Sequence, residues 1–280
     1  MLATKSLRKR KLRSWLTIVG IFISIATIFM LVSLSLGLQG AVEEQFRSLG
    51  TDKFFIQPST GFLGPPGSVG GVLLTEEDVS IVDKVQGVKD YSFFVAGNAK
   101  IEFAGEIRYR LVWGIPLEHQ EVWLETGSFE INEGRFLEDG DKDKIVLGYL
   151  FEEGKVFKKS VRVGNKITIN DKDFKVKGNV QRIGNPDDDR MVLMGMEDFR
   201  ELFGIEERVD VIMVQIKEGE DLNEVSDRIE KKLRTARSVT EKTQDFDILN
   251  PEELLESFGN VLSIITVFLS GIAAISLFVG

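Results

Sequence analysis

The chain has 280 residues, of which 43% are hydrophobic and 28% charged, and its formal net charge is −9. The absence of cysteine excludes a disulfide framework, and the excess of acidic over basic residues in 43–256, 44 against 29, disfavours nucleic-acid binding. Neither 14–42 nor 257–280 contains a charged side chain, which excludes a purely soluble protein.

The first 50 residues predict a basic cytoplasmic segment over 1–13 and a membrane helix with its stalk over 14–50. The apolar run is too long for a signal peptide and exceeds the ~30 Å apolar thickness of a bilayer when helical. The positive-inside rule places the preceding cations in the cytoplasm, with an aromatic residue at the interface. The predicted membrane-interface residues are Lys5, Arg8, Lys9, Arg10, Lys11, Arg13 and Trp15.

Residues 250–280 predict a second stalk and membrane helix. Asn250 is a good N-cap and Pro251 suits the first helical position. If the first helix runs outward, 43–256 lies outside the cytoplasm and the second helix returns the chain inward. Because the sequence is still apolar at Gly280, we interpret it as a fragment of a longer membrane protein. No ionisable residue interrupts either run, so both helices are expected to act as anchors and mechanical elements.

Between the stalks, 51–116 predicts the first half of an α+β subdomain. Residues 53–57 are strand-like, and Thr75 with Asp78 forms a helix N-terminus whose helix extends to about Gln86. Residues 100–113 predict a β-hairpin around Ala104 and Gly105, with its apolar side chains on one face and its charged side chains on the other, wet face.

Residues 208–249 complete this pattern with a strand at 209–217, a helix with one apolar face at 222–236 and a strand at 246–249. The combined order suits a split ferredoxin-like α+β subdomain. Residues 117–207 do not fit that order and predict a β-rich inserted subdomain. Its expected elements are strands at 144–148, 161–169 and 174–177 and a helix at 197–203 that ends at Gly204.

Few residues form a recognisable catalytic or metal-binding motif. His119 is the single histidine and is interpreted as a surface loop residue. Asp139, Asp141 and Asp143 match the first spacings of a calcium loop, but the required glycine and closing glutamate are missing. Residues 187–189 form an acidic turn that is interpreted as solvated. No metal, cofactor or catalytic residue is therefore assigned, although a Ser–Lys dyad stays open.

The segment 58–71 is rich in glycine and proline but lacks the spacing of a phosphate-binding loop. We interpret it as a mobile loop that contacts a partner or substrate. The residues proposed for that contact are Gly61, Phe62, Leu63, Gly64, Pro65, Pro66 and Gly67.

Several of these segments resemble MacB-like ABC transporter permeases, the FtsX/LolC/MacB group of type VII architecture. The resemblance is carried by 7–21 (LRKRKLRSWLTIVGI), Leu49-Gly50, 134–136 (GRF), Asp245-Phe246 and 271–280 (GIAAISLFVG). It runs along the whole chain, and the large inserted part favours a MacB-like or LolC-like member over an FtsX-like one. The sequence departs from the family by stopping where two further membrane helices are expected.

The resemblance implies that 1–13 forms a basic cytoplasmic N-terminal helix. It also implies an extracytoplasmic domain, with a porter-like part and an inserted Sabre-like part, carried on two long transmembrane helices of the cell membrane. It implies an ABC ATPase subunit as partner, a second permease copy and an extracytoplasmic adaptor. ATP and Mg²⁺ would be bound by that ATPase, and its closure would move the stalks and the outer domain to export a peptide, drug, lipid or lipoprotein cargo. The alternatives are a two-pass receptor with an outer ligand-binding domain and a membrane-anchored hydrolase.

Overall fold

A computed structural model describes residues 52–59, 73–127 and 129–250, together with scattered residues between 15 and 40 and between 259 and 271. The chain divides into two compact units, one formed by 1–47 with 251–280 and the other by 48–250. The predicted cations of 1–13 and the predicted contact loop at 61–67 lie outside the described residues.

The elements of the second unit alternate short helices with strands. The strands are β1 (Lys53–Pro58), β2 (Leu74–Thr75), β3 (Val88–Phe103), β4 (Glu106–Ile115), β5 (Ile131–Gly134), β6 (Lys144–Leu147), β7 (Lys166–Ile169), β8 (Lys172–Val180), β9 (Val192–Gly195), β10 (Arg208–Val209), β11 (Val211–Ile216) and β12 (Phe246–Leu249). The helices are α2 (Glu76–Asp83), α3 (Glu121–Leu124), α4 (Tyr149–Glu152), α5 (Met196–Phe203) and α6 (Leu222–Ala236), with 3₁₀ turns η1 (Leu117–His119) and η2 (Asp188–Arg190).

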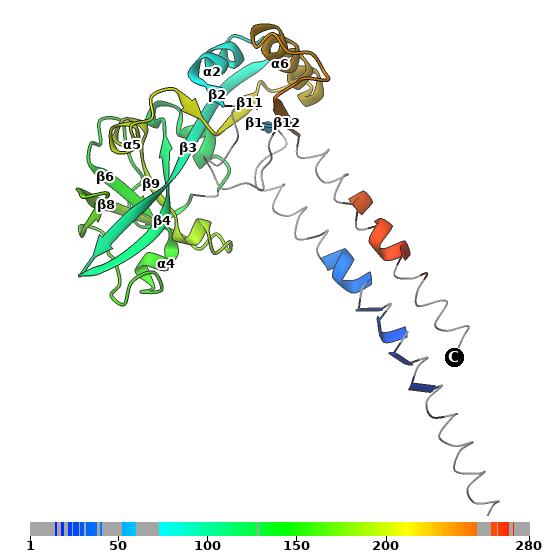
Figure 1. Ribbon diagram of the computed structural model, residues 1–280, viewed down its shortest axis with the longest axis horizontal. Coiled ribbons are helices and arrows are strands. Elements are labelled where there is room, and N and C mark those ends of the chain that lie inside the picture. Colours follow the sequence, from blue (N-terminus) through cyan, green and yellow to red (C-terminus); the bar gives the residue numbers. More distant parts are fainter. Residues whose placement is uncertain are drawn as a thin grey trace, which may run out of the picture. The chain divides into compact units, whose positions relative to one another are not determined.

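One lobe is an antiparallel sheet in the order β12-β1-β11-β3, with the connecting helices α2 and α6 packed against each other (Figure 1). This is the strand order of a split ferredoxin-like unit, as the sequence predicted. Val225, Ile229 and Leu233 of α6 are fully buried, so that helix packs with the face that the sequence indicated. We call this part the ferredoxin-like lobe.

The other lobe is a small closed barrel. Hydrogen-bonded pairs run from β3 to β4, β9, β6, β8 and β7, and β7 pairs with β3 again, which closes the ring. Ile101, Ile145 and Phe174 are fully buried in it, and α5 packs on its outside against β4 and β9 (Figure 1). We call this part the barrel lobe. Its first two strands, β3 and β4, come from the segment expected to form the first half of the porter-like part.

The larger of two apolar clusters extends through both lobes. Phe54 and Ile229 of the ferredoxin-like lobe belong to the same buried cluster as Phe174 and Ile145 of the barrel lobe. A second cluster covers another face of the sheet and contains Met213, together with residues of α3 and of the segments that follow it. Because the main cluster does not stop at the boundary between the lobes, neither lobe has a core of its own.

Local signals in the sequence set several helix ends. The Thr75 N–H donates to the Asp78 carboxylate at 2.9 Å at the start of α2, and Asp221 accepts from two N–H groups at the start of α6. Gly204 ends α5 in the left-handed conformation, as expected. Helix α2 ends at Asp83, earlier than the predicted Gln86, and the chain then turns into β3 at Val88.

The β3–β4 hairpin forms as predicted, but its faces differ from the prediction. The two-residue turn at Ala104 and Gly105 pairs Phe103 with Glu106, so Ile101 lies opposite Arg108 and shares its face. The apolar residues of β3 and β4 therefore project from opposite sides of the sheet, which leaves Ile107 and Tyr109 49% and 68% exposed. The assignment of all apolar residues to one face was wrong.

The first unit is described only in part. Its described residues are helical, and their large apolar side chains are mostly exposed, for example Phe22 at 71%, Phe29 at 74% and Phe268 at 67%. The Thr266 hydroxyl donates to the Ser35 hydroxyl at 3.4 Å. Among the residues that the structure describes, no helix is both long enough and apolar enough to cross a membrane. The predicted membrane spans are described only in part, by separate residues between 15 and 40 and between 259 and 271.

Glycine at position 114 allows α5 to lie directly on β4. A Cβ atom there would come within 2.5 Å of Phe199 on α5, so Gly114→Ala should lower the free energy of unfolding by about 1–3 kcal/mol. Urea denaturation measures this loss. In the double variant with Phe199→Ala, the two losses should sum to more than the loss of the double variant, because removing Cγ and the ring of Phe199 relieves part of the clash with the new Cβ. Strictly additive losses would contradict this account of the contact.

Candidate functional site

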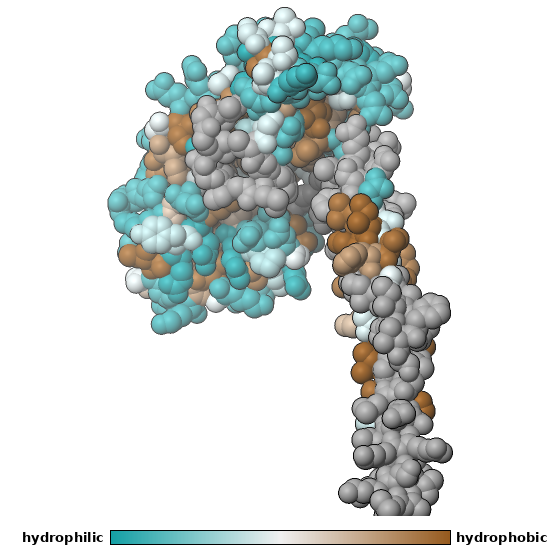
Figure 2. Space-filling view, turned by 45° about the vertical axis from the view of Figure 1, so that its right-hand side comes forward, coloured by the Kyte–Doolittle hydropathy of each residue, from teal (hydrophilic) through white to brown (hydrophobic). Residues whose placement is uncertain are grey.

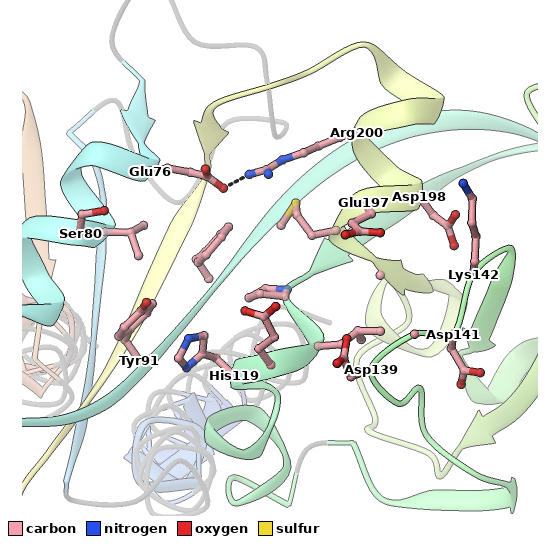
Figure 3. Close-up of a pocket in the computed structure, with 18 residues that line it drawn as sticks. Glu76, Ser80, Tyr91, His119, Asp139, Asp141, Lys142, Glu197, Asp198 and Arg200 are labelled. Atoms are coloured by element: carbon pink, nitrogen blue, oxygen red, sulfur yellow. Dashed lines mark hydrogen bonds and ion pairs between the residues drawn. The ribbon is translucent and has the colours of Figure 1, made fainter.

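The cleft between the ferredoxin-like and barrel lobes is the candidate site. It encloses 520 Å³ and is lined from one side by α2 and β3 and from the other by η1, the 139–142 loop and α5 (Figure 3). Its ionisable lining residues are mainly acidic: Glu76, Glu118, Asp139, Asp141, Glu197 and Asp198, against His119, Lys142 and Arg200. Apolar side chains, among them Phe93 and Met196, complete the lining. A mixed apolar and charged lining of this kind suits the noncovalent binding of a ligand.

An ion pair joins the two lobes at the cleft. The Arg200 guanidinium on α5 donates to the Glu76 carboxylate on the first turn of α2 (Figure 3). Burial lowers the pKa of Arg200 from its ordinary value, but a guanidinium stays charged at neutral pH. The stacked rings of Phe199 and Phe203, 4.3 Å apart, hold this part of α5 against β4 and β3. The ion pair therefore connects the first turn of α2 to a well-packed helix.

His119 lies in η1 on the cleft wall and contacts Asp90 and Tyr91. Its Nδ1 is 3.0 Å from the Asp90 carboxylate, and its ring stacks on Tyr91 with centroids 4.3 Å apart (Figure 3). The sequence interpretation of a surface loop residue was thus incomplete, because both partners come from β3. Burial, followed by nearby carboxylates, raises the pKa of Tyr91 above its ordinary value, so its hydroxyl stays protonated at neutral pH.

The 138–141 loop is held by its own carboxylate. Asp141 accepts from Arg135 Nη1 and Lys144 Nζ, both at 2.6 Å, and from the Glu138 N–H at 3.1 Å. The hydrogen bonds from Arg135 hold the pKa of Asp141 well below its usual range, although burial opposes them. Asp141 is thus already paired with two cations, and no group of acidic or histidine residues suited to a metal occurs among the described residues.

Asp198 anchors the far wall of the cleft. Its Oδ2 accepts the Asp143 N–H at 2.7 Å, and its Oδ1 lies 4.0 Å from Lys172 Nζ. Only 2% of the residue is exposed, and this burial raises the pKa of its carboxyl group.

In the predicted acidic turn at 187–189, Asp189 is buried as well and accepts the Ile183 N–H at 2.8 Å. That aspartate is a structural group, which corrects its interpretation as part of a solvated turn.

The sequence identified only part of the candidate site. Of the predicted interface residues only Trp15 is described, as a helical residue that is 62% exposed. The sequence drew attention to His119, Asp139 and Asp141, which line the cleft, but it missed the pair of Glu76 and Arg200. No local signal marks that pair, because its members are far apart in the sequence and neither belongs to a motif.

We expect Asp141→Asn to lower the free energy of unfolding by about 2–3 kcal/mol at pH 7. Because the folded-state pKa of Asp141 lies below the unfolded value of about 3.9, its stabilisation is present above that pH and is lost as the pH falls toward the folded-state pKa. The difference between variant and wild type in urea denaturation should therefore shrink below about pH 4.

Asp139→Asn, an exposed position in the same loop, is the matched control and should change little. An equal loss at Asp139, or a difference at Asp141 that does not depend on pH, would show that the ion pairs of Asp141 are not responsible.

Glu76→Gln should widen the range of distances between α2 and α5, because it removes one charge from the ion pair that joins them. Cysteines introduced at Ser80 and Glu197 are specific sites for spin labels, since the chain has none of its own. Pulsed electron paramagnetic resonance then reports the distance distribution. Glu77→Gln, on the same helix and exposed, is the control. Equal broadening in both variants would contradict a role for the pair.

Comparison with known proteins places the chain in a family. The model of the MacB-like periplasmic core domain matches residues 14–232. An uncharacterized ABC transporter permease of Methanocaldococcus jannaschii is 35% identical over 279 residues, which cover 99% of this chain and 67% of that protein. The macrolide export ATP-binding/permease protein MacB of Bdellovibrio bacteriovorus is 25% identical over 289 residues, which cover 99% of this chain and 44% of that protein. The chain thus spans less than half the length of that MacB protein.

Solved structures share the fold. The periplasmic region of MacB from Actinobacillus actinomycetemcomitans has a TM-score of 0.63 at 16% identity, covering 79% of this chain and 98% of that one. The extracellular domain of the noncanonic ABC-type transporter YknZ from Gram-positive bacteria has a TM-score of 0.55 at 15% identity, covering 71% of this chain and 100% of that one. These likenesses confirm the predicted α+β class. With the family match and the Methanocaldococcus relative, they show that the chain belongs to the MacB-like family of ABC transporter permeases.

Proposed function

We propose that this chain is the permease subunit of an ATP-driven ABC exporter or mechanotransmission complex. The observation that carries the proposal is the family match over 14–232, which includes the first apolar run and most of the outer domain. A relative that is matched along 99% of this chain is itself named an ABC transporter permease. The chain would be a noncatalytic subunit, and ATP with Mg²⁺ would be bound and hydrolysed by a partner ATPase.

The apolar character of the flanking segments supports a place in the cell membrane. The described residues of the first unit expose large apolar side chains (Figure 2), and exposed apolar surface of this extent is stable in lipid rather than in water. The N-terminus would lie in the cytoplasm, with Lys5, Arg8, Lys9, Arg10, Lys11, Arg13 and Trp15 at the interface. Residues 43–256 would be extracytoplasmic.

The strand arrangement of the outer domain supports a mechanical role. The described residues of this unit begin at 52 and end at 250. Strand β1 starts at Lys53 and β12 ends at Leu249, and these two strands pair with each other. A displacement of the two ends would therefore reach the sheet at adjacent strands and pass through β11 to β3 and the barrel lobe. The domain would move with a second permease copy and an extracytoplasmic adaptor, and the 61–67 loop is a proposed contact for a partner or cargo.

The cargo classes compatible with this proposal are peptides, drugs, lipids and lipoproteins. The acidic lining of the cleft favours cationic groups over anionic ones. Transport would depend on a change in the cleft, because the ion pair of Glu76 and Arg200 holds together the two lobes that line it.

We predict that an ABC ATPase co-purifies with the full chain from membranes and that restraining the cleft slows its ATP hydrolysis several-fold. Cysteines at Glu76 and Arg200 can be joined by a reducible bifunctional reagent, since the chain has no other cysteine. Reduction of the linker should restore the rate. The measurement is the ATPase rate of the purified complex in lipid nanodiscs.

A linker within the ferredoxin-like lobe is the control. Lys232 Nζ donates to the Lys84 carbonyl at 3.4 Å, so cysteines at these two positions can be joined without bridging the lobes. If both linkers slow hydrolysis equally, the cleft does not take part in coupling. If no ATPase accompanies the chain, the permease proposal fails and a receptor function becomes the better hypothesis.

A further inference from the structure

One stretch of the barrel lobe has the opposite charge to the rest of the outer domain. Residues 155–177 contain eight basic and two acidic side chains, whereas the other residues of 43–256 contain 21 basic and 42 acidic ones. The stretch comprises the loop before β7, then β7 and the first half of β8. We call its exposed and half-buried cations the basic face: Lys158, Lys159, Arg162, Lys166, Lys175 and Lys177.

The strand register forces like charges together at the centre of this face. Lys166 of β7 lies directly opposite Lys175 of β8, and Lys144 of β6 lies opposite Lys175 on its other side. Directly opposite residues project from the same face, and neighbouring strands are about 4.8 Å apart. Like charges in this arrangement destabilise the folded domain. An external anion would relieve that repulsion.

Within the described part of the chain, the basic face has no counterions of its own. Lys144 is paired with Asp141 at 2.6 Å, and Lys172, behind the face, is paired with Asp143 at 2.8 Å. By contrast, no described carboxylate comes within 4.0 Å of the charged nitrogens of the six cations of the basic face. Their charge is therefore available to a partner.

Other side chains on the same outer surface restrict the class of partner that can bind the basic face. Thr168, the next outward residue of β7, lies opposite Asp173 of β8 and Glu102 of β3. Glu102 in turn lies opposite Ile107 of β4, and the exposed Tyr109 follows two residues later on the same face. A uniformly anionic lipid surface would be repelled by the two carboxylates. A polypeptide can match both signs of charge and also cover the apolar groups.

We propose that the basic face of the barrel lobe binds an acidic segment of a partner polypeptide, with Lys166 and Lys175 at the centre of the contact and Tyr109 at its margin. Carboxylates of the partner would lie between the two ammonium groups and remove their mutual repulsion. Tyrosine is common in protein interfaces, where its ring adds contact area at a small entropic cost. This proposal concerns the outer surface of the barrel and depends neither on the cleft nor on transport.

The test uses the full chain in phosphatidylcholine nanodiscs and a short fluorescein-labelled peptide rich in glutamate, with fluorescence anisotropy as the readout. The wild-type chain should bind this peptide at least about tenfold more tightly than the same peptide with glutamine in place of glutamate. Lys166→Glu should weaken binding about threefold to tenfold. It should also raise Tm by about 1–3 °C, because it turns a repulsive cross-strand pair into an attractive one.

A variant that binds less well while unfolding at a higher temperature cannot owe its loss to misfolding. Lys231→Glu, an exposed position on α6 with the same change of net charge, is the matched control and should bind as the wild type does. Carbodiimide coupling of the bound peptide, followed by mass spectrometry, should identify Lys166 and Lys175 as the attached residues. Equal affinity for the glutamine peptide, an equal loss in Lys231→Glu or coupling only elsewhere would overturn the proposal.

Three further measurements distinguish an acidic polypeptide from a lipid or a second copy of the chain. If phosphatidylglycerol abolishes peptide binding equally in the wild-type chain and in Lys166→Glu, the peptide and the lipid compete at a site other than the basic face, and the proposal is wrong. If phosphatidylglycerol protects Lys166 and Lys175 from acetylation in the absence of peptide, the basic face binds lipid and the proposal is wrong. Light scattering that detects a dimer lost in Lys166→Glu would likewise overturn it, because the occupant would then be a second copy of the chain.

Discussion

The backbone hydrogen bonds of β3 are the constraint on which the outer domain depends. This strand has 16 residues, and its first half pairs with β11 in the ferredoxin-like lobe while its second half pairs with β4 and β7 in the barrel lobe. A strand cannot bend sharply without losing ladder hydrogen bonds, so the two lobes are joined by a stiff element. The shared apolar core adds to this coupling, because its buried residues come from both lobes.

The cleft follows from the same arrangement. The lobes meet along β3, and the ion pair of Glu76 and Arg200 adds a second connection between α2 and α5. A partly exposed ion pair contributes little to stability, so the cleft can change its width at a modest cost while β3 and the shared core stay intact. We propose that a permease of this family uses such a change when its flanking helices move.

The sequence predicted those features that depend on neighbouring residues. The capping pair of Thr75 and Asp78, the end of α5 at Gly204 and the apolar face of α6 all depend on contacts within one helix or turn. The faces of the β3–β4 hairpin could have been predicted as well, because a two-residue turn fixes which residues are opposite. The pairing of β7 with β3, which closes the barrel, joins segments that are far apart in the sequence and has no local signal.

The central claim is that β3 makes the two lobes one cooperative unit, and native-state hydrogen exchange of the full chain tests it most directly. The account predicts that the amide groups of 88–96 and 97–103 exchange with the same free energy of opening and the same dependence on urea, because each half of the strand opens only when the common core opens. If the amide groups of the barrel half exchange through an opening of lower free energy that leaves the ferredoxin-like half protected, the lobes unfold separately and the account is contradicted.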